Sequence, residues 1–413
     1  MTRPREQREF FAVRTVGEAL AGFRPARRTG TERVLLDEAL GRVPAEPVRS
    51  PHALPGFARA TVDGFAVRAA DTYGVSDGQP GYLDLAGEAR MGRPPDAELR
   101  PGAAIAIATG APLPPGADAV VKVEHTQSTL PGLIEVVRAA TPGEGMVRPD
   151  EDAAAGAELA RPGRPLRAAD LGMLAAAGVT EVLALGRARV AIVSTGDELV
   201  PSETAELETG QVRDATAPAL AALVREAGGE PSFAGIVSDD RDALEATLRR
   251  ALARSCDLLV VSAGSSVGAR DETASAIASL GEPGIWCHGL ALRPGKPTLL
   301  GECGGVPVIG LPGNPRSALV VFRLVGMPLV RLVGGCSEPP PEPSVRTRLG
   351  RDLPSAAGRL DVVQVALEEG VATPLFGSSA LLSILARADG HLTVPEAATG
   401  LPAGAEVEVT LYR

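Results

Sequence analysis

Aromatic residues are scarce in this 413-residue chain: Phe, Trp and Tyr together make up 3% of it. Hydrophobic residues still account for 45%, so the cores must be built mainly from Ala, Val and Leu. There is also no basic excess, because 41 Lys and Arg stand against 51 Asp and Glu. This balance argues against broad nucleic-acid binding, which needs a basic face to neutralise phosphates, but it does not forbid a small basic pocket.

Long apolar runs and patterned cysteines are missing as well. The chain begins with a charged segment, and no apolar run approaches the ~18 residues needed to span a membrane. The four histidines lack metal-ligand spacing, which disfavours a zinc site. We therefore expect a cytoplasmic protein with no membrane partner and with reduced thiols. The cysteines, none in a CxxC pair, are Cys256, Cys287, Cys303 and Cys336.

Two common nucleotide-binding signatures are absent. No GxGxxG follows an apolar strand in a dinucleotide-binding context, and no phosphate-binding P-loop motif is present. A nicotinamide-dependent dehydrogenase, the generic alternative for an α/β chain, is therefore disfavoured.

What the sequence does contain is a strict alternation of strands and helices over residues 188–324. Alternation of this length predicts a doubly wound, mostly parallel sheet. We expect Ser238 or Asp239 to cap the second helix of this region. The predicted strands are 188–194, 232–237, 257–262 and 306–310, and the predicted helices are 217–227, 241–253, 272–280 and 315–324.

The flanking segments have a different texture. Thr15 and Glu18 have capping-box spacing and predict a helix through about Gly22, and a second helix is predicted over 168–177, with Gly178 after it. Short β-prone runs between residues 54 and 148 predict a compact β-rich lobe. The proline-rich stretch 338–343 predicts a stiff linker, and the short strands after it a small β-barrel or sandwich.

These patterns predict a multidomain α/β protein with four parts. The predicted parts are an N-terminal mixed α/β domain (1–50 and 149–186), an inserted β-rich lobe (51–148), the central α/β domain (187–334) and a C-terminal β domain (335–413).

Turns built from small residues follow three of the predicted strands. Because the carboxyl ends of parallel strands meet at one edge of a sheet, we expect these turns to cluster there. Glycine and serine let backbone N–H groups approach an anion closely, so the turns predict an anion-binding crevice. The candidate binding residues are Ser194, Gly196, Gly264, Ser266, Gly268, Pro312, Gly313 and Asn314.

Charged residues accompany these turns. The carboxylates Glu198, Asp239 and Asp271 suit Mg²⁺, which commonly takes one or two protein carboxylates together with substrate phosphate oxygens. Arg293 and Lys296 could hold a phosphate or another oxyanion. The alternative is structural: Asp239 and Asp271 also stand where helix N-caps would be, and the Pro-Gly pairs could be simple turns.

One more carboxylate stands apart from this region. Asp63 precedes Gly64 inside the predicted β-rich lobe, and Thr109 follows the apolar run 103–108. An Asp-Gly turn in a hairpin is the default explanation for Asp63 from the pattern alone.

The chain resembles the molybdopterin molybdenumtransferases, the MoeA type that also forms the E domain of gephyrin. The likeness covers nearly the whole length, and the Arg-Pro-Gly-Lys-Pro and Leu-Pro-Gly-Asn-Pro elements in this order make it highly specific. The matching stretches are 63–67, 109–111, 151–152, 194–199, 210–211, 239–240, 262–271, 293–297, 311–315 and 378–395.

The resemblance implies an elongated homodimer with an active site shared between one subunit's α/β domain and its partner's β lobe. It implies insertion of molybdate into adenylylated molybdopterin with release of AMP, aided by Mg²⁺. By position, Asp63, Glu198, Asp239 and Asp271 would be catalytic, and the last three would hold the metal. Thr109 matches a motif position of the N-terminal part. The molybdopterin adenylyltransferase and cofactor-accepting enzymes are implied as protein partners.

Other functions remain open because several positions depart from the family pattern. Most of these departures remove a polar group or add a methyl near the expected crevice, which favours a scaffold or pterin-binding paralogue without turnover. A third possibility is the adenylyltransferase of the preceding step, which the additional N- and C-terminal parts disfavour. The departing residues are Ala58, Ala60, Gly145, Asp150, Thr216, Ala263 and Gly289.

Overall fold

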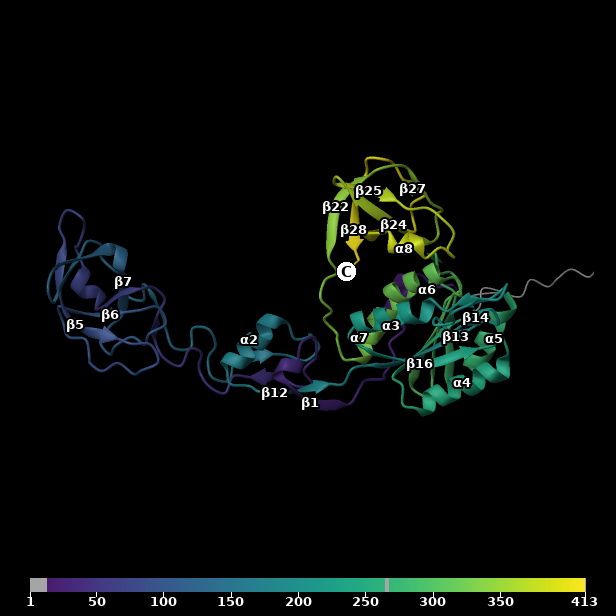
Figure 1. The fold of residues 1–413 in the computed structure, drawn as a ribbon, viewed down its shortest axis with the longest axis horizontal. Helices are drawn as coiled ribbons and strands as arrows, with labels where there is room; N and C mark the ends of the chain where they lie inside the picture. Colours follow the sequence, from purple (N-terminus) through teal and green to yellow (C-terminus); the bar gives the residue numbers. More distant parts are fainter. Residues whose placement is uncertain (1–12, 264–266, 413) are drawn as a thin grey trace, which may run out of the picture.

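The computed structural model describes residues 13–263 and 267–412, without the side chains of residues 129 and 267–271. The chain is elongated, with a β-rich lobe at one end and an α/β domain at the other, beside which a C-terminal β-barrel stands (Figure 1). The predicted multidomain α/β class is confirmed. Among the described residues, no helix combines the length and apolarity needed to cross a bilayer.

The α/β domain is built on a six-stranded sheet in the order β16-β13-β17-β21-β20-β18. Its first four strands are parallel, and because β13 lies between β16 and β17 the sheet is doubly wound, as predicted. Two antiparallel strands that the sequence did not predict, β20 and β18, complete the edge beyond β21. The strand bounds are Arg189–Thr195 (β13), Glu230–Val237 (β16), Leu258–Ser262 (β17), Pro283–His288 (β18), Leu299–Cys303 (β20) and Val306–Leu311 (β21).

Helices cover both faces of this sheet because side chains alternate along each strand. Val190 and Ile192 pack with α3, α6, η4 and α7 on one face, whereas Ala191 and Val193 pack with α4 and α5 on the other. The predicted helix 315–324 is longer than expected, since α6 continues through η4 into α7. The bounds are Thr216–Glu226 (α3), Arg241–Ala253 (α4), Val267–Ala278 (α5), Pro315–Val321 (α6), Phe322–Gly326 (η4) and Met327–Val333 (α7).

The prediction for the cap of α4 is wrong. Neither Ser238 nor Asp239 caps the helix: Asp240 is the N-cap, and its Oδ1 accepts a hydrogen bond from the Ala243 N–H at 2.8 Å. The Asp239 carboxylate is thereby left for another role.

The N-terminal segment first joins the α/β domain and then forms the middle of the molecule. Helix α1 has the predicted capping box between Thr15 and Glu18, and Phe23 after it packs on Trp286 with ring centroids 5.5 Å apart. Beyond it, β1 pairs with β12 and β2 with β11. The bounds are Val16–Gly22 (α1), Thr31–Leu35 (β1), Leu36–Glu38 (η1), Val48–Arg49 (β2), Glu158–Ala160 (β11), Ala168–Ala176 (α2) and Glu181–Leu185 (β12).

The β-rich lobe is inserted between β2 and β11. Its six-stranded sheet runs β7-β4-β6-β5-β9-β8, and the chain enters and leaves the lobe through the pair β3 and β10. The bounds are Arg59–Ala60 (β3), Gly64–Val67 (β4), Ala69–Thr72 (η2), Gly81–Ala89 (β5), Ala103–Ile107 (β6), Ala119–Lys122 (β7), Val123–His125 (η3), Thr126–Leu130 (β8), Leu133–Val136 (β9) and Met146–Val147 (β10).

The C-terminal domain is a β-barrel, as one of the two predicted alternatives had it. Pairing between β24 and β26 closes the ring β24-β25-β22-β28-β26, and β19 of the α/β domain joins β24 from outside. The two domains therefore share a sheet. The bounds are Leu292–Arg293 (β19), Ser344–Leu349 (β22), Leu353–Pro354 (β23), Leu360–Glu368 (β24), Val371–Pro374 (β25), Ser383–Ala386 (α8), Gly390–Val394 (β26), Gly400–Leu401 (β27) and Glu406–Leu411 (β28).

Candidate active site

The turn after β13 and the turn after β16 meet at the carboxyl edge of the sheet, as the sequence predicts. The Gly196 N–H donates to the Val237 carbonyl at 3.0 Å, and the Asp239 N–H donates to Asp197 Oδ1 at 3.1 Å. Gly196 has a φ of +153°, and a Cβ there would lie 2.7 Å from Oε2 of Glu198. Only glycine therefore lets Glu198 fold back over this turn.

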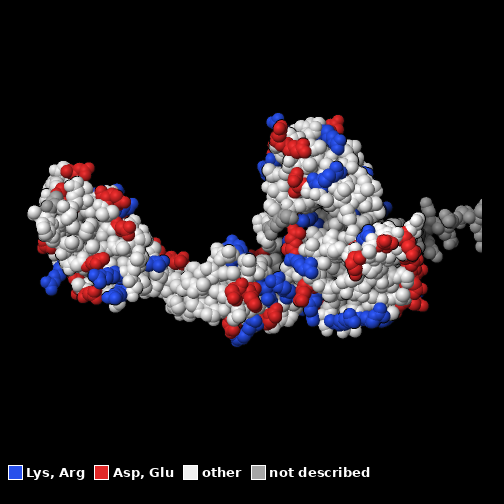
Figure 2. Space-filling view, viewed as in Figure 1, with Lys and Arg blue, Asp and Glu red and all other residues white. Residues whose placement is uncertain are grey.

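Three carboxylates gather at these two turns. Asp197, Glu198 and Asp239 are all exposed, and Figure 2 shows acidic side chains on the edge of the α/β domain near β14 (Leu199–Val200). Partial desolvation raises the pKa of the Asp239 carboxyl, and the negative charges of Asp197 and Glu198 raise it further. A bound cation would relieve this repulsion. We call the cluster of Asp197, Glu198 and Asp239 the acidic pole.

The donors of the acidic pole fit a hard divalent cation such as Mg²⁺, because all of them are carboxylate oxygens. Within the described side chains, however, no group of three or more His, Cys, Asp or Glu residues lies close enough together to hold a metal. The third predicted ligand, Asp271, lies in α5 outside the described side chains. The predicted metal set thus stays a prediction.

The turn after β17 carries three more of the predicted residues. Gly264 and Ser266 lie outside the described residues, and Gly268 lies in the first turn of α5, where no side chain is described. The start of α5 at Val267 is earlier than the predicted residue 272.

Ser194 is fully buried and does not face the crevice in this structure. Its hydroxyl donates to Asp214 Oδ2 at 2.6 Å, and Asp214 Oδ1 accepts from the backbone N–H groups of Thr216 and Ala217 at 3.0 Å each. Asp214 thus links the end of β13 to the start of α3. Asp214 was not among the predicted site residues, although an Asp just before a predicted helix is a recognisable cap signal.

The predicted basic residues line a cleft of roughly 730 Å³ between the α/β domain and the barrel. Figure 1 shows the barrel standing over α6 at this boundary. The turn that carries Arg293 and Lys296 depends on Gly295, whose φ is +126° and where a Cβ would lie 2.4 Å from Val321. From the α/β domain, the cleft is lined by residues 290–297 and by Pro312, Asn314, Arg316 and Ser317; from the barrel domain, by residues 356–359 and 377–379.

Cations outnumber carboxylates in this basic cleft. Asp361, just behind its lining, is 4% exposed and pairs with Arg359 at 2.8 Å and with Arg293 at 3.7 Å. Lys296 is exposed, and its side chain has no ion pair within the described part of the chain. Arg316 and Arg359 were not among the predicted site residues, because only the docking of the barrel places them beside Arg293. The cleft has the charge of an oxyanion site.

Asp63 and Thr109 lie together, but apart from both charged sites. The Asp63 Oδ1 accepts hydrogen bonds from the Thr109 backbone N–H at 2.7 Å and from the Thr109 hydroxyl at 2.9 Å. These bonds, the backbone one foremost, lower the pKa of the Asp63 carboxyl. Both residues belong to the β-rich lobe, which lies at the opposite end of the molecule from the α/β domain (Figure 1). One chain alone does not bring them to Glu198.

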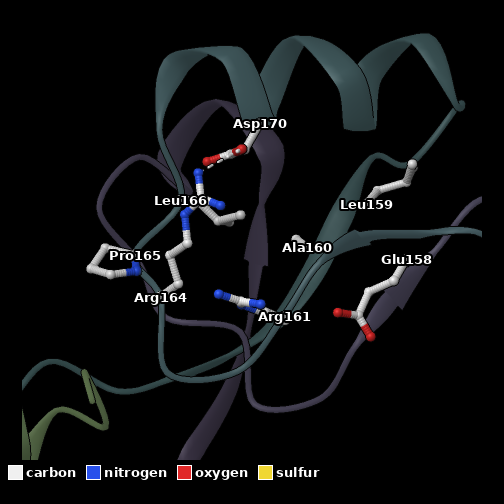
Figure 3. Close-up of a pocket in the computed structure, with 8 residues that line it drawn as sticks. All are labelled: Glu158, Leu159, Ala160, Arg161, Arg164, Pro165, Leu166 and Asp170. Atoms are coloured by element: carbon white, nitrogen blue, oxygen red, sulfur yellow. Dashed lines mark ion pairs between the residues drawn. The ribbon is translucent and has the colours of Figure 1, made fainter. Parts of the chain in front are cut away.

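A smaller pocket of roughly 210 Å³ lies beside α2 in the middle of the molecule (Figure 3). Its charges are already paired: Asp170 lies 3.7 Å from Arg164 and 3.0 Å from Arg167, and Arg161 lies 2.6 Å from Glu338 of the linker. The charged residues of this pocket therefore have a structural role, since they hold the linker against the middle domain.

Known proteins resemble this chain over nearly all of its length. Three family models match it: the MoeA N-terminal region (domain I and II) over 13–178, the probable molybdopterin binding domain over 191–332, and the MoeA C-terminal region (domain IV) over 346–412. Molybdopterin molybdenumtransferase 2 of Mycobacterium tuberculosis is 35% identical over 403 residues, which cover 96% of this chain and 97% of the relative.

Two further relatives extend the comparison. The molybdopterin molybdenumtransferase of Bacillus subtilis is 31% identical over 391 residues, covering 93% of this chain and 90% of the relative. The crystal structure of the molybdopterin biosynthesis moeA protein from Pyrococcus horikoshii OT3 is similar with a TM-score of 0.83 and 31% identity, covering 97% of this chain and all (100%) of that one.

Proposed function

The chain belongs to the MoeA family, whose relatives of matching length are molybdopterin molybdenumtransferases, and we propose that it inserts molybdate into adenylylated molybdopterin with release of AMP. The observation that carries this proposal is the placement of two oppositely charged sites on one sheet edge. The acidic pole lies at the ends of β13 and β16, and the basic cleft borders the turn after β21.

The spacing of the strand ends beside the two sites suits one extended substrate. In the sheet order β16-β13-β17-β21, the end of β13 and the end of β21 are two strand spacings apart. At ~4.8 Å per spacing this is roughly 10 Å, with the turn after β17 between them. A pterin held along this edge could reach molybdate in the basic cleft with one end and present its AMP phosphate to the acidic pole with the other.

The residues of the two sites divide the work. Arg293 and Lys296 would bind molybdate as the oxyanion substrate, with the turn at Asn314 closing the cleft. Glu198 and Asp239, together with Asp271, would hold Mg²⁺, which when bound offsets the negative charge that develops on the departing AMP. Gly196 keeps Glu198 over the turn after β13.

We also propose that the active form is a homodimer with a shared site. Asp63 and Thr109 form a compact, exposed unit in the β-rich lobe, far from the α/β domain of their own chain. In a two-fold dimer of elongated chains, the lobe of one subunit can meet the carboxyl edge of the other. The partner's Asp63 would then complete the site next to Glu198.

The direct test is AMP release from adenylylated molybdopterin by the purified protein, with molybdate and Mg²⁺ added separately and together. The proposal requires that AMP appear only when molybdate is present, and that molybdenum be found in the pterin afterwards. Absence of AMP release under all conditions, in protein that binds the pterin, would reject the enzymatic function.

That negative outcome would support the second candidate, a pterin-binding protein without turnover. The observation that favours it lies in the β-rich lobe, where Ala58 and Ala60 belong to an apolar core. Side chains in these positions therefore offer no polar group to a substrate in a neighbouring subunit.

A further inference from the structure

We propose that Arg316 is a further oxyanion-binding residue of the basic cleft and that it gives the cleft a preference for dianions over monoanions of the same shape. The proposal rests on the proposed function only in that it concerns the same cleft. It adds a residue and a charge selectivity that the predicted set of Arg293 and Lys296 does not include.

The contacts of Arg316 leave part of its guanidinium group unused. The residue stands in the first turn of α6, and its backbone N–H donates to the Ser379 carbonyl at 3.2 Å. One guanidinium nitrogen, Nη1, donates to the Gly377 carbonyl at 3.1 Å. The Nε atom is buried and has no hydrogen-bond partner in the described residues. A buried donor without an acceptor is unfavourable, so the protein does not use this guanidinium group fully. Arg316 also lines the cleft, where an entering oxyanion could approach the rest of the group.

The charges around Arg316 also favour an anion beside it. Burial lowers the pKa of Arg316, and the nearby positive charge of Arg293 lowers it further. The carboxylate behind the cleft, Asp361, is already engaged by Arg359 and Arg293. Arg316 has no carboxylate partner within the described part of the chain, so its charge is not neutralised by the protein itself.

A purely structural role explains only part of this arrangement. Bonds to the two barrel carbonyls would fasten the barrel to α6, but the side-chain bond needs only one neutral donor. A permanently charged guanidinium beside Arg293 is favourable when an anion lies between the two cations. Since the charge–charge energy scales with the product of the charges, Arg316 contributes about twice as much to binding a dianion as to binding a monoanion.

Tungstate and perrhenate test this charge selectivity because both are tetrahedral oxyanions, the first a dianion and the second a monoanion. Binding of each to the full-length protein is measured by isothermal titration calorimetry at constant low ionic strength. The variants are Arg316→Gln, which removes the charge, Arg316→Lys, which keeps it, and Arg346→Gln as the matched control. Arg346 is an exposed arginine of β22 outside the cleft.

We expect Arg316→Gln to weaken tungstate binding by about ten- to a hundredfold, as loss of a charged hydrogen bond does, and perrhenate binding by roughly the square root of that factor. Arg316→Lys should recover much of the tungstate affinity, and Arg346→Gln should match the wild type. Urea unfolding of each variant checks that it is folded.

Three results would overturn the proposal: tungstate binding by Arg316→Gln within twofold of wild type, an equal loss for both anions, or no binding of either anion to the wild-type protein. The proposed function fails separately, since it requires AMP release. A wild-type protein that binds tungstate through Arg316 but releases no AMP would retain this assignment and lose the enzymatic one.

Discussion

Asp239 and Asp240 are adjacent carboxylates with different expected roles, and their substitution tests the acidic pole most sharply. Asp240 caps α4 through the Ala243 N–H, whereas the Asp239 carboxyl faces the negative charges of Asp197 and Glu198. We predict that Asp239→Asn lowers AMP release by about a hundredfold or more, the scale seen when one preorganised electrostatic contact of an active site is removed. The same substitution should leave the metal-free fold intact.

The raised pKa of Asp239 fixes the sign of its effect on stability. A carboxyl whose folded pKa lies above the ordinary 3.8 favours the folded state at low pH, and this contribution is lost as pH rises through the folded value. At neutral pH the ionised carboxyl is therefore unfavourable without a cation. Asp239→Asn should leave the free energy of unfolding unchanged or raise it by a few tenths of a kcal/mol, as for exposed charge pairs.

With Mg²⁺ bound, the wild type should instead be more stable than Asp239→Asn. A ligand that binds only the folded state stabilises it by about 2.7 kcal/mol at a hundred times its dissociation constant. Urea unfolding with and without Mg²⁺ should show this gain in the wild type and a much smaller one in Asp239→Asn.

Asp240 supplies two matched controls. Asp240→Asn removes the same charge one residue away but keeps a good N-cap, so activity and stability should stay close to wild type. Asp240→Ala should lose about 1 kcal/mol of stability and keep its activity. If Asp239→Asn retained Mg²⁺-dependent AMP release, or if Asp240→Asn lost it, the assignment of the acidic pole would be refuted.

Three further predictions concern other parts of the molecule. Lys296→Ala should raise the apparent KM for molybdate several-fold with little change in unfolding, and an unchanged KM would remove Lys296 from the oxyanion site. Mixed dimers re-formed from Asp63→Ala and Glu198→Ala chains should recover up to about a quarter of wild-type activity. Random pairing makes half of the dimers mixed, and each mixed dimer has one intact site out of two. No recovery of activity would contradict a shared site. Burial lowers the pKa of His391 to about 4. The free energy of unfolding should therefore fall by up to about 3 kcal/mol as pH drops from 6.5 to 4, because the unfolded chain binds the proton more readily. If a His391→Gln variant showed the same fall, the cause would lie elsewhere.

The sequence predicts this fold well where structure depends on local pattern. The capping box at Thr15 and Glu18 forms as expected, because its groups lie within one helical turn. The parallel core follows from apolar runs such as Leu258–Ser262, every residue of which is buried. Strands β20 and β18 escaped prediction for different reasons. Strand β20 forms a tight hairpin with β21 across Gly304-Gly305, a recognisable turn signal that the prediction did not use. Strand β18 pairs with β20 across a longer connection that no short motif indicates.

The candidate site shows the same boundary between local and tertiary information. Small-residue turns identify the carboxyl edge, since parallel strands must end there together. The prediction placed the cap of α4 at Ser238 or Asp239 and missed Asp240, because all three precede the helix and only the backbone path decides between them. Arg316 and Arg359 are 43 residues apart in the chain and reach one cleft only because the barrel docks beside α6. No periodicity in the sequence encodes that docking.

The separation of the two charged sites is itself a requirement of the proposed chemistry. Where a carboxylate lies close to the basic cleft, ion pairs engage it, as Asp361 shows with Arg359 and Arg293. Had Glu198 and Asp239 been placed within such reach, the same pairing would neutralise both the metal ligands and the oxyanion ligands. Two strand spacings keep the acidic pole and the basic cleft on one edge but outside contact distance. In the proposed reaction, each site would then keep its charge until a substrate with a phosphate at one end and a molybdate acceptor at the other bridges them.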